Sequence, residues 1–154
     1  MMLHFAYGAN MSRAIVRRHA AGAHPLGAAE LPGHRFVITA DGYASVEPLA
    51  AQSVHGVLWC ITPRDRVTLD AWENLGGGLY RAEMLPVRCA GRRMPALVYL
   101  ARPAGQGRPK PGYMELVIAA AREWELPDAY IRSLQRWAAL RPTGSATRKL
   151  GEFG

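Results

Sequence analysis

The sequence predicts an α+β fold built on a mostly antiparallel sheet or a small barrel. Several short runs are rich in β-branched and aromatic residues, and two later segments show a clear helical period. The strand-like and helix-like segments mix without the regular alternation that a parallel βαβ sheet requires. With 154 residues and no internal repeat, the chain is most simply one domain.

The first half of the chain is predicted to contain four strands. Residues 3–7 form a short buried strand. Residues 34–39 and 44–49 form two short strands, separated by the Asp-Gly-Tyr turn signal at residues 41–43. Residues 54–62 form a longer strand, because they combine β-branched and aromatic side chains.

Two helices are predicted among these strands. Residues 10–20 have helical character, with Asn10 or Ser12 available as the N-cap. Residues 62–75 begin with Thr62 as N-cap and a proline at the first helical position, and three glycines follow them. These signals fix both ends of the second helix better than those of the first.

The second half is predicted to form a hairpin and two helices. Residues 79–89 and 94–101 flank an Ala-Gly-Arg-Arg turn at residues 90–93. Residues 113–126 and 127–140 each repeat apolar side chains at helical spacing, with a proline at the boundary between them.

The predicted domain covers residues 1–140. Residues 102–112, rich in proline and glycine, are expected to be a surface loop and not a domain boundary. Residues 141–154 show no hydrophobic period and are predicted to be a flexible C-terminal tail.

Charge and hydropathy limit which classes of partner the protein is expected to bind. The formal charge of +7 raises nucleic acid as a partner, but the basic residues are dispersed and do not interleave with aromatic residues. No apolar run approaches the roughly 18 residues of a membrane span, and the N-terminus lacks the pattern of a signal peptide. We therefore expect a cytoplasmic protein without a nucleic-acid or membrane partner.

The residues that bind metals or carry redox chemistry form no known motif. Cys60 and Cys89 have no CxxC spacing and are predicted to be buried free thiols. The five histidines are scattered, without an HExxH or HxH pattern. We expect neither a metal nor a cofactor.

The junction Ala-Tyr-Gly-Ala-Asn at residues 6–10 connects a predicted strand to a predicted helix. Such a junction is often only a tight turn. Its backbone N–H groups and the positive end of a helix can also bind an anion. Gly8 would let a ligand approach the backbone, and Asn10 would add a side-chain amide. The junction is therefore a candidate site for a carboxylate or an oxyanion.

Glu73 is the second candidate. On a helical wheel it falls outside the apolar arc of its helix, towards Arg66 and Asp70, so periodicity alone favours a solvated glutamate. The three glycines that follow can, however, bring another segment or a ligand close to its carboxylate.

Four motifs together resemble those of the gamma-glutamylcyclotransferase family, in order and in approximate spacing. They are Phe-Ala-Tyr-Gly-Ala-Asn-Met at residues 5–11, Leu-Asp-Ala-Trp-Glu at 69–73, Gly-Leu-Tyr-Arg at 78–81 and Pro-Gly-Tyr at 111–113. The resemblance extends from Phe5 to about Trp137. Ala9 stands where the family usually has serine, and Asn74 stands where it often has glycine. Both departures retain the catalytic acid and leave the substrate open.

This resemblance implies a small mixed, mostly antiparallel β-barrel with flanking helices and an active site in a cavity. It implies Glu73 as the general acid and base. The residues that it places around the substrate are Tyr7, Gly8, Ala9, Asn10, Tyr80 and Tyr113. The implied protein is a cofactor-independent cyclotransferase of the lyase or acyltransferase class. It acts, as a monomer or homodimer, on small γ-glutamyl compounds such as those of glutathione metabolism.

The implied reaction suits these residue types. The α-amine of a γ-glutamyl group attacks its own γ-carbonyl, giving 5-oxoproline and a free amine or amino acid. A folded substrate gives this attack a high effective molarity. One carboxylate can carry the protons, which typically contributes about 10²–10⁴-fold. For that role, burial beside Trp72 would have to raise the pKa of Glu73 from about 4.3 towards neutrality.

The sequence leaves one alternative open: a non-catalytic member of the same fold that binds a small amino compound or a protein. The retained Glu73 argues against it. The sequence does not indicate which amine the substrate releases, because the loop at residues 102–112 and the glycine run contain no recognisable binding motif.

Overall fold

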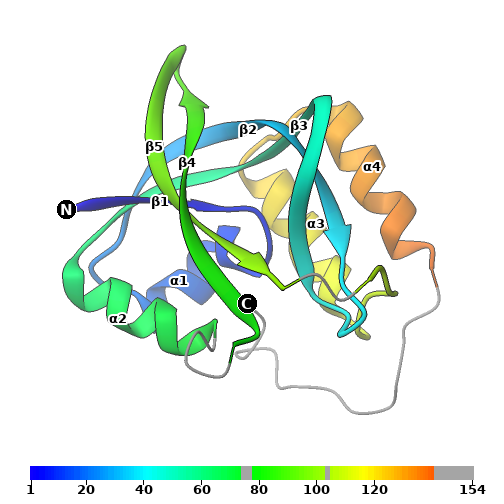
Figure 1. Cartoon of the computed structure of the whole chain (residues 1–154), viewed down its shortest axis with the longest axis horizontal. Helices are drawn as coiled ribbons and strands as arrows, with labels where there is room; N and C mark the ends of the chain where they lie inside the picture. The colour runs from blue at the N-terminus through cyan, green and yellow to red at the C-terminus, as the bar shows by residue number, and fades with distance from the viewer. Residues whose placement is uncertain (74–77, 103–104, 141–154) are drawn as a thin grey trace.

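The computed structural model describes residues 1–73, 78–102 and 105–140, in which five strands form a closed barrel (Figure 1). The strands are β1 (Met2–Ala6), β2 (His24–Ile38), β3 (Ala44–Ile61), β4 (Tyr80–Cys89) and β5 (Arg92–Ala101). Their order around the barrel is β1-β3-β2-β4-β5. β1 and β5 run parallel where the barrel closes, and the other neighbours are antiparallel. The predicted small mixed, mostly antiparallel barrel with flanking helices is confirmed.

The β2–β3 hairpin is much longer than predicted. The two strands pair from His24–Cys60 to Ile38–Ala44, so the runs predicted as separate strands at residues 44–49 and 54–62 belong to one strand. Ala51 has a φ of 67°, and β2 has register shifts near its prolines and glycines. Such irregularities bend a strand around a barrel, and they also break the alternation that sequence analysis depends on.

The β4–β5 hairpin is confirmed, but its turn is two residues shorter than predicted, because Arg92 and Arg93 belong to β5. The strands pair from Tyr80–Ala101 to Cys89–Arg92, which leaves a two-residue turn. Ala90 and Gly91 have φ values of 51° and 76°. Positive φ at both positions is what a type I′ turn requires, and this turn matches the twist of the two strands.

The first two helices are α1 (Arg13–His19) and α2 (Pro63–Trp72). Ser12 caps α1, because its hydroxyl accepts a hydrogen bond from the N–H of Ile15 at 3.4 Å. Asn10 lies in the preceding 3₁₀ helix, η1 (Ala9–Met11), and its side chain does not cap α1. Thr62 caps α2 as predicted, whereas residues 74–77, with two of the three predicted stop glycines, lie outside the described residues.

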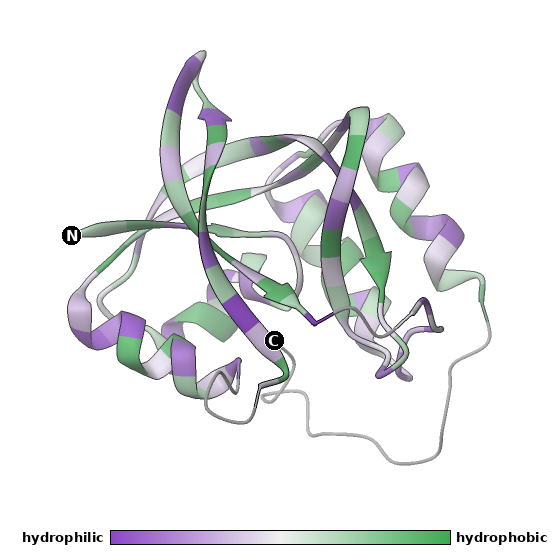
Figure 2. Ribbon diagram, in the orientation of Figure 1, coloured by the Kyte–Doolittle hydropathy of each residue, from purple (hydrophilic) through white to green (hydrophobic). Residues whose placement is uncertain are grey.

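The last two helices, α3 (Tyr113–Glu123) and α4 (Asp128–Ala138), lie side by side next to β2 and β3 (Figure 1). Both confirm the predicted pattern. α3 buries Val117 and Ala121 completely, and α4 alternates hydrophilic and hydrophobic patches along its length (Figure 2). The predicted tail, residues 141–154, lies outside the described residues.

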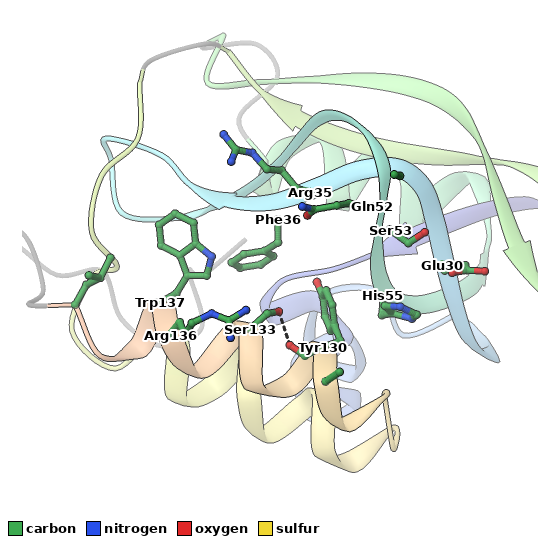
Figure 3. Close-up of a pocket in the computed structure, with 13 residues that line it drawn as sticks. Glu30, Arg35, Phe36, Gln52, Ser53, His55, Tyr130, Ser133, Arg136 and Trp137 are labelled. Carbon is green, nitrogen blue, oxygen red and sulfur yellow. Dashed lines mark hydrogen bonds between the residues drawn. The ribbon is translucent and has the colours of Figure 1, made fainter.

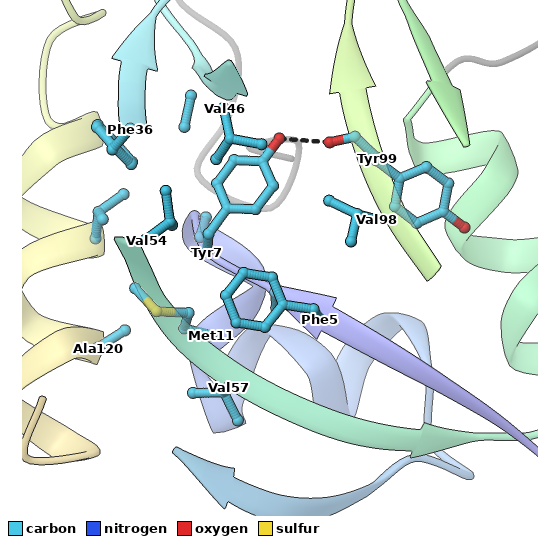
Figure 4. Close-up of a cluster of buried hydrophobic side chains, with 14 of the residues drawn as sticks. Phe5, Tyr7, Met11, Phe36, Val46, Val54, Val57, Val98, Tyr99 and Ala120 are labelled. Carbon is cyan, nitrogen blue, oxygen red and sulfur yellow. Dashed lines mark hydrogen bonds between the residues drawn. The ribbon is translucent and has the colours of Figure 1, made fainter. Parts of the chain in front are cut away.

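The interior of the barrel is a continuous apolar core. Phe5, Val54 and Val98 are fully buried there, and Tyr7 lies among them (Figure 4). Cys89 is buried and Cys60 half-buried, and neither forms a disulfide. No helix in the described part of the chain is long and apolar enough to cross a membrane.

Candidate active site

Glu73 lies immediately after the last residue of α2 and caps that helix. Its N–H donates to the carbonyl oxygen of Leu69 at 2.9 Å, and only 6% of its surface is exposed. The interpretation of Glu73 as a solvated helix residue is therefore wrong. At the C-cap the backbone leaves the helical path (φ −79°, ψ 0°), so the helical wheel no longer sets the direction of the side chain.

The covered side of α2 includes both apolar and polar residues, and Leu69 is buried in the core. Asp70 is paired with Arg66 at 2.9 Å and accepts a hydrogen bond from the hydroxyl of Tyr99, on β5, at 2.7 Å. Val67, which periodicity assigns to the core, is 69% exposed. A hydrogen bond to the barrel thus acts together with the burial of Leu69 to orient this helix.

Asn10 is the direct partner of Glu73. Its side-chain Nδ2 donates to Oε1 of Glu73 at 3.3 Å, and Asn10 is itself only 4% exposed. The turn after β1 brings Asn10 back beneath the end of α2. Gly8, inside that turn, has a φ of −112°, so its backbone conformation does not itself require glycine.

A small cavity of about 20 Å³ lies between these groups. It is lined by His4, Phe5, Ala6, Tyr7, Gly8, Asn10, Ala44, Glu73, Tyr80 and Tyr99. Of these ten residues, Tyr80 alone is partly exposed, so it forms the outer wall. We call this space the Glu73 cavity. A volume of roughly 10–15 Å³ for a water-sized probe already accommodates one water molecule, so the cavity is of that order of size.

Five of the seven predicted site residues line the Glu73 cavity, and two do not. Ala9 and Tyr113 do not line it, and both are without any exposed surface. The hydroxyl of Tyr113 accepts a hydrogen bond from the N–H of Ala44 at 3.2 Å. Tyr113 therefore holds one of the residues that line the cavity.

Tyr7 and Tyr113, both near Glu73, stay protonated. Burial, followed by the negative charge of Glu73, raises the pKa of Tyr7 well above its ordinary value. Burial also raises the pKa of Tyr113. The hydroxyl of Tyr7 donates to the carbonyl oxygen of Tyr99 at 2.5 Å (Figure 4), and that of Tyr80 donates to the carbonyl oxygen of Ala44 at 2.8 Å.

Sequence analysis missed five residues of the cavity wall, of which two have polar side chains, His4 and Tyr99. His4 is 4% exposed, and its Nδ1 lies 3.1 Å from the carbonyl oxygen of Leu97. Burial lowers the pKa of His4 to about 4, and the positive charge of Arg66 adds to the effect. The only signal in the sequence is a histidine within an otherwise apolar strand.

A larger hollow of about 770 Å³ lies between α4 and the β2–β3 hairpin (Figure 3), and it shares no residue with the Glu73 cavity. We call it the α4 groove. It is lined by Glu30, Arg35, Phe36, Ala51, Gln52, Ser53, His55, Ala129, Tyr130, Ser133, Arg136, Trp137 and Leu140. Two of its charged groups have ion-pair partners outside it: Arg35 pairs with Glu47, and Glu30 pairs with Arg88 at 3.0 Å. Within the described ranges, no group of three or more His, Cys, Asp and Glu side chains could hold a metal ion.

Solved structures of known proteins share this fold. A gamma-glutamyl cyclotransferase superposes with a TM-score of 0.83 at 22% identity, over 96% of this chain and 92% of that one. An uncharacterized protein from Homo sapiens gives 0.82 at 22% identity, with the same coverage of both chains. YkqA from Bacillus subtilis gives 0.80 at 24% identity, over 93% of this chain and 56% of YkqA. At these identities the likeness is one of fold.

The sequence comparisons identify the family. No curated protein matches the chain significantly. The model of the AIG2-like family matches residues 53–134, which is more than half of the chain and includes both Glu73 and Tyr80. The chain belongs to the AIG2-like family and has a gamma-glutamylcyclotransferase-like fold.

Proposed function

We propose that this protein is a gamma-glutamyl cyclotransferase, which converts a γ-glutamyl group into 5-oxoproline and releases an amine or amino acid. The observation that carries the proposal is a buried carboxylate, Glu73, held by Asn10 in a cavity with protonated tyrosines. Carboxyl groups are seldom fully buried unless they are paired or functional. The family and the fold support the same reaction.

The environment of Glu73 suits proton transfer. In general, burial favours the uncharged form of a carboxyl group and brings it closer to proton exchange near neutral pH. The hydrogen bond from Asn10 holds one carboxylate oxygen of Glu73 at the cavity. This arrangement resembles the geometry that general acid–base catalysis needs, with the acid held and not free to rotate.

The proposed reaction moves two protons from the attacking nitrogen to the leaving nitrogen. Glu73 takes one proton from the α-ammonium group, and the resulting amine attacks the γ-carbonyl carbon. Glu73 gives this proton to the leaving nitrogen of the tetrahedral intermediate and takes the second proton from the attacking nitrogen. The bond from the γ-carbon to the leaving nitrogen then breaks, and Glu73 passes the second proton to the released amine. Both protons end on the leaving amine, so Glu73 returns to its starting state. General acid–base catalysis of this kind typically contributes about 10²–10⁴-fold.

Substrate binding requires the Glu73 cavity to enlarge, because a γ-glutamyl group is several times larger than a water molecule. Tyr80 is the wall residue most able to move, since it alone is partly exposed. Its hydroxyl bond to the carbonyl oxygen of Ala44 would have to break during such a movement.

The direct test is an assay of 5-oxoproline release from a panel of γ-glutamyl amino acids and γ-glutamyl amines. The matched controls are the α-glutamyl isomers, whose amine cannot form a five-membered ring with the scissile carbonyl. We expect release from at least one γ-glutamyl compound and from none of the α-glutamyl isomers. If no compound of the panel reacts but γ-glutamyl compounds still bind, the protein is a non-catalytic member of the fold and the proposal is wrong.

A further inference from the structure

The Glu73 cavity presents an excess of hydrogen-bond acceptors. Asn10 directs its Nδ2 at Glu73, because a carboxylate can only accept, and its Oδ1 is thereby left facing elsewhere. Oδ1 of Asn10 and Nε2 of His4 are both shielded from solvent and have no partner among the described residues. Both side chains line the same cavity as the carboxylate of Glu73.

The neutral tautomer of His4 is fixed by its other ring nitrogen. The carbonyl oxygen of Leu97 can only accept, so Nδ1 of His4 carries the hydrogen. Because burial lowers the pKa of His4 to about 4, the ring is neutral near pH 7, and Nε2 presents a lone pair. The parallel pairing of His4 with Leu97, where β1 meets β5, holds the ring in place.

The hydroxyl donors on the cavity wall are already used. Tyr7 donates to the carbonyl oxygen of Tyr99, Tyr80 to that of Ala44, and Tyr99 to the carboxylate of Asp70. The unmatched side-chain atoms of the cavity are therefore acceptors. Buried acceptors without a donor are costly, so the cavity favours a small, donor-rich group over an anion.

We infer that His4 and Asn10 form a recognition site for the α-ammonium group of the substrate, with Nε2 of His4 as the specificity-determining acceptor. This inference rests on the proposed function. An ammonium group offers three N–H donors, which match Nε2 of His4, Oδ1 of Asn10 and the carboxylate of Glu73. The proton donated to Glu73 is the first one transferred, whereas the bonds to His4 and Asn10 hold the nitrogen in place during that step.

A site for the α-ammonium group would distinguish the substrate from the product. The enzyme must bind a free primary amine before cyclisation, and it must release 5-oxoproline, whose ring nitrogen carries one hydrogen and no charge. Loss of two donors on ring closure weakens the interaction with His4 and Asn10. Substrates with an acylated α-nitrogen should be rejected for the same reason.

The test compares two substitutions of His4 with two ligands. His4→Asn retains a donor near Nδ1 but removes the acceptor at the position of Nε2, whereas His4→Gln places an amide near Nε2. The ligands are a γ-glutamyl amide substrate and the matching glutaryl amide, which lacks only the α-amine. KM and kcat are measured for the first, and the competitive inhibition constant for the second.

We expect His4→Asn to raise KM for the γ-glutamyl amide about tenfold, which is the size of one hydrogen bond, with a smaller change in kcat. The inhibition constant of the glutaryl amide should stay within about twofold, and His4→Gln should recover most of the loss in KM. Equal changes for the two ligands, or an unchanged KM in a well-folded His4→Asn protein, would overturn the inference.

Two further measurements keep the test independent of folding and of turnover. Melting temperatures show whether either variant is misfolded, and in that event the wild-type protein is titrated with both ligands. Preferential binding of the γ-glutamyl amide supports an ammonium site, and equal binding contradicts it. If the wild-type protein releases no 5-oxoproline, the proposed reaction fails, but the same titration still decides whether the ammonium site exists.

Discussion

The α4 groove and the Glu73 cavity differ in size and in chemistry. The α4 groove, about 770 Å³ and open to solvent, is lined by aromatic and charged side chains, two of them in surface ion pairs. The Glu73 cavity measures about 20 Å³, and it holds the buried side chains of His4, Asn10 and Glu73. The smaller space is the better candidate for an active site.

The difference shows that unmet polar groups indicate a site better than volume does. A partly exposed glutamate such as Glu30 costs little, because water reaches it and Arg88 pairs with it. Glu73 and its neighbours lose that solvation, and folding must tolerate the cost. A fold that retains such a cluster in its interior has a use for it, which makes matched substitutions in the two hollows informative.

The largest difference is expected between the two glutamates. Glu73→Gln keeps the volume of the side chain but cannot carry a proton, so 5-oxoproline release should fall by at least about 10²-fold. Glu30→Gln, the matched change in the α4 groove, should leave the rate within about twofold and the stability within about 0.5 kcal/mol. Rates of 5-oxoproline release and melting temperatures measure both. Similar rates for wild type and Glu73→Gln would refute the mechanism.

The second comparison uses pH and the two histidines. The folded protein binds a proton at His4 only near pH 4, against 6.5 for an ordinary histidine, so the unfolded chain holds more protons between these values. The free energy of unfolding therefore rises with pH between about 4 and 6.5. The contribution of His4 to this rise amounts to about 3 kcal/mol and is fully present above about pH 6.5. His4→Gln should remove most of that dependence.

His55, in the α4 groove, provides the control for this effect. Burial lowers its pKa, but it is only half-buried and the charge of Glu30 opposes the shift. His55→Gln should therefore change the pH dependence less than His4→Gln does. Denaturant unfolding of the wild type, His4→Gln and His55→Gln between pH 4 and 7 measures the pH dependence of stability in each protein. An equal or larger effect at His55 would mean that His4 is not the more deeply shielded group.

The third comparison concerns the two amides. Asn10→Ala removes the hydrogen bond that fixes Glu73, and a bond to a charged group contributes about 1.5–3 kcal/mol, so kcat/KM should fall about 10–100-fold. Gln52→Ala, at an exposed position of the α4 groove, should change kcat/KM less than about twofold. Steady-state kinetics with one γ-glutamyl substrate gives kcat/KM for both variants. An equal loss of kcat/KM in Asn10→Ala and Gln52→Ala would show a general effect on folding and not a role of Asn10.

The smallest comparison concerns two tyrosine hydroxyls. Tyr7→Phe leaves the carbonyl oxygen of Tyr99 without its donor inside the barrel and should cost about 1–2 kcal/mol of unfolding free energy. The hydroxyl of Tyr130 is shielded but has only the backbone of His55 as a poorly aligned partner, so Tyr130→Phe should be nearly neutral. Urea unfolding of both variants gives the two values. A larger loss for Tyr130→Phe would reverse the assignment of strong and weak hydrogen bonds.

The elements with local signals were predictable from the sequence. Thr62 and the following proline mark the start of α2, and the Ala-Gly-Arg-Arg segment marks the β4–β5 hairpin, although only its first two residues form the turn. The long β2–β3 hairpin was predicted only in pieces, because Ala51 and the register shifts of β2 interrupt the period on which a strand prediction depends.

The sequence by itself determined the α+β class, the positions of the helices and the motifs that resemble the gamma-glutamylcyclotransferase family. It could not determine that Glu73 is buried, because its position on the helical wheel favours solvent and the fold covers it by contacts with residues far along the chain. Nor could it place His4 in the cavity wall, which depends on the parallel closure of β1 against β5. Periodicity reports only local geometry, whereas the pairing of distant strands decides which polar side chains lose contact with water.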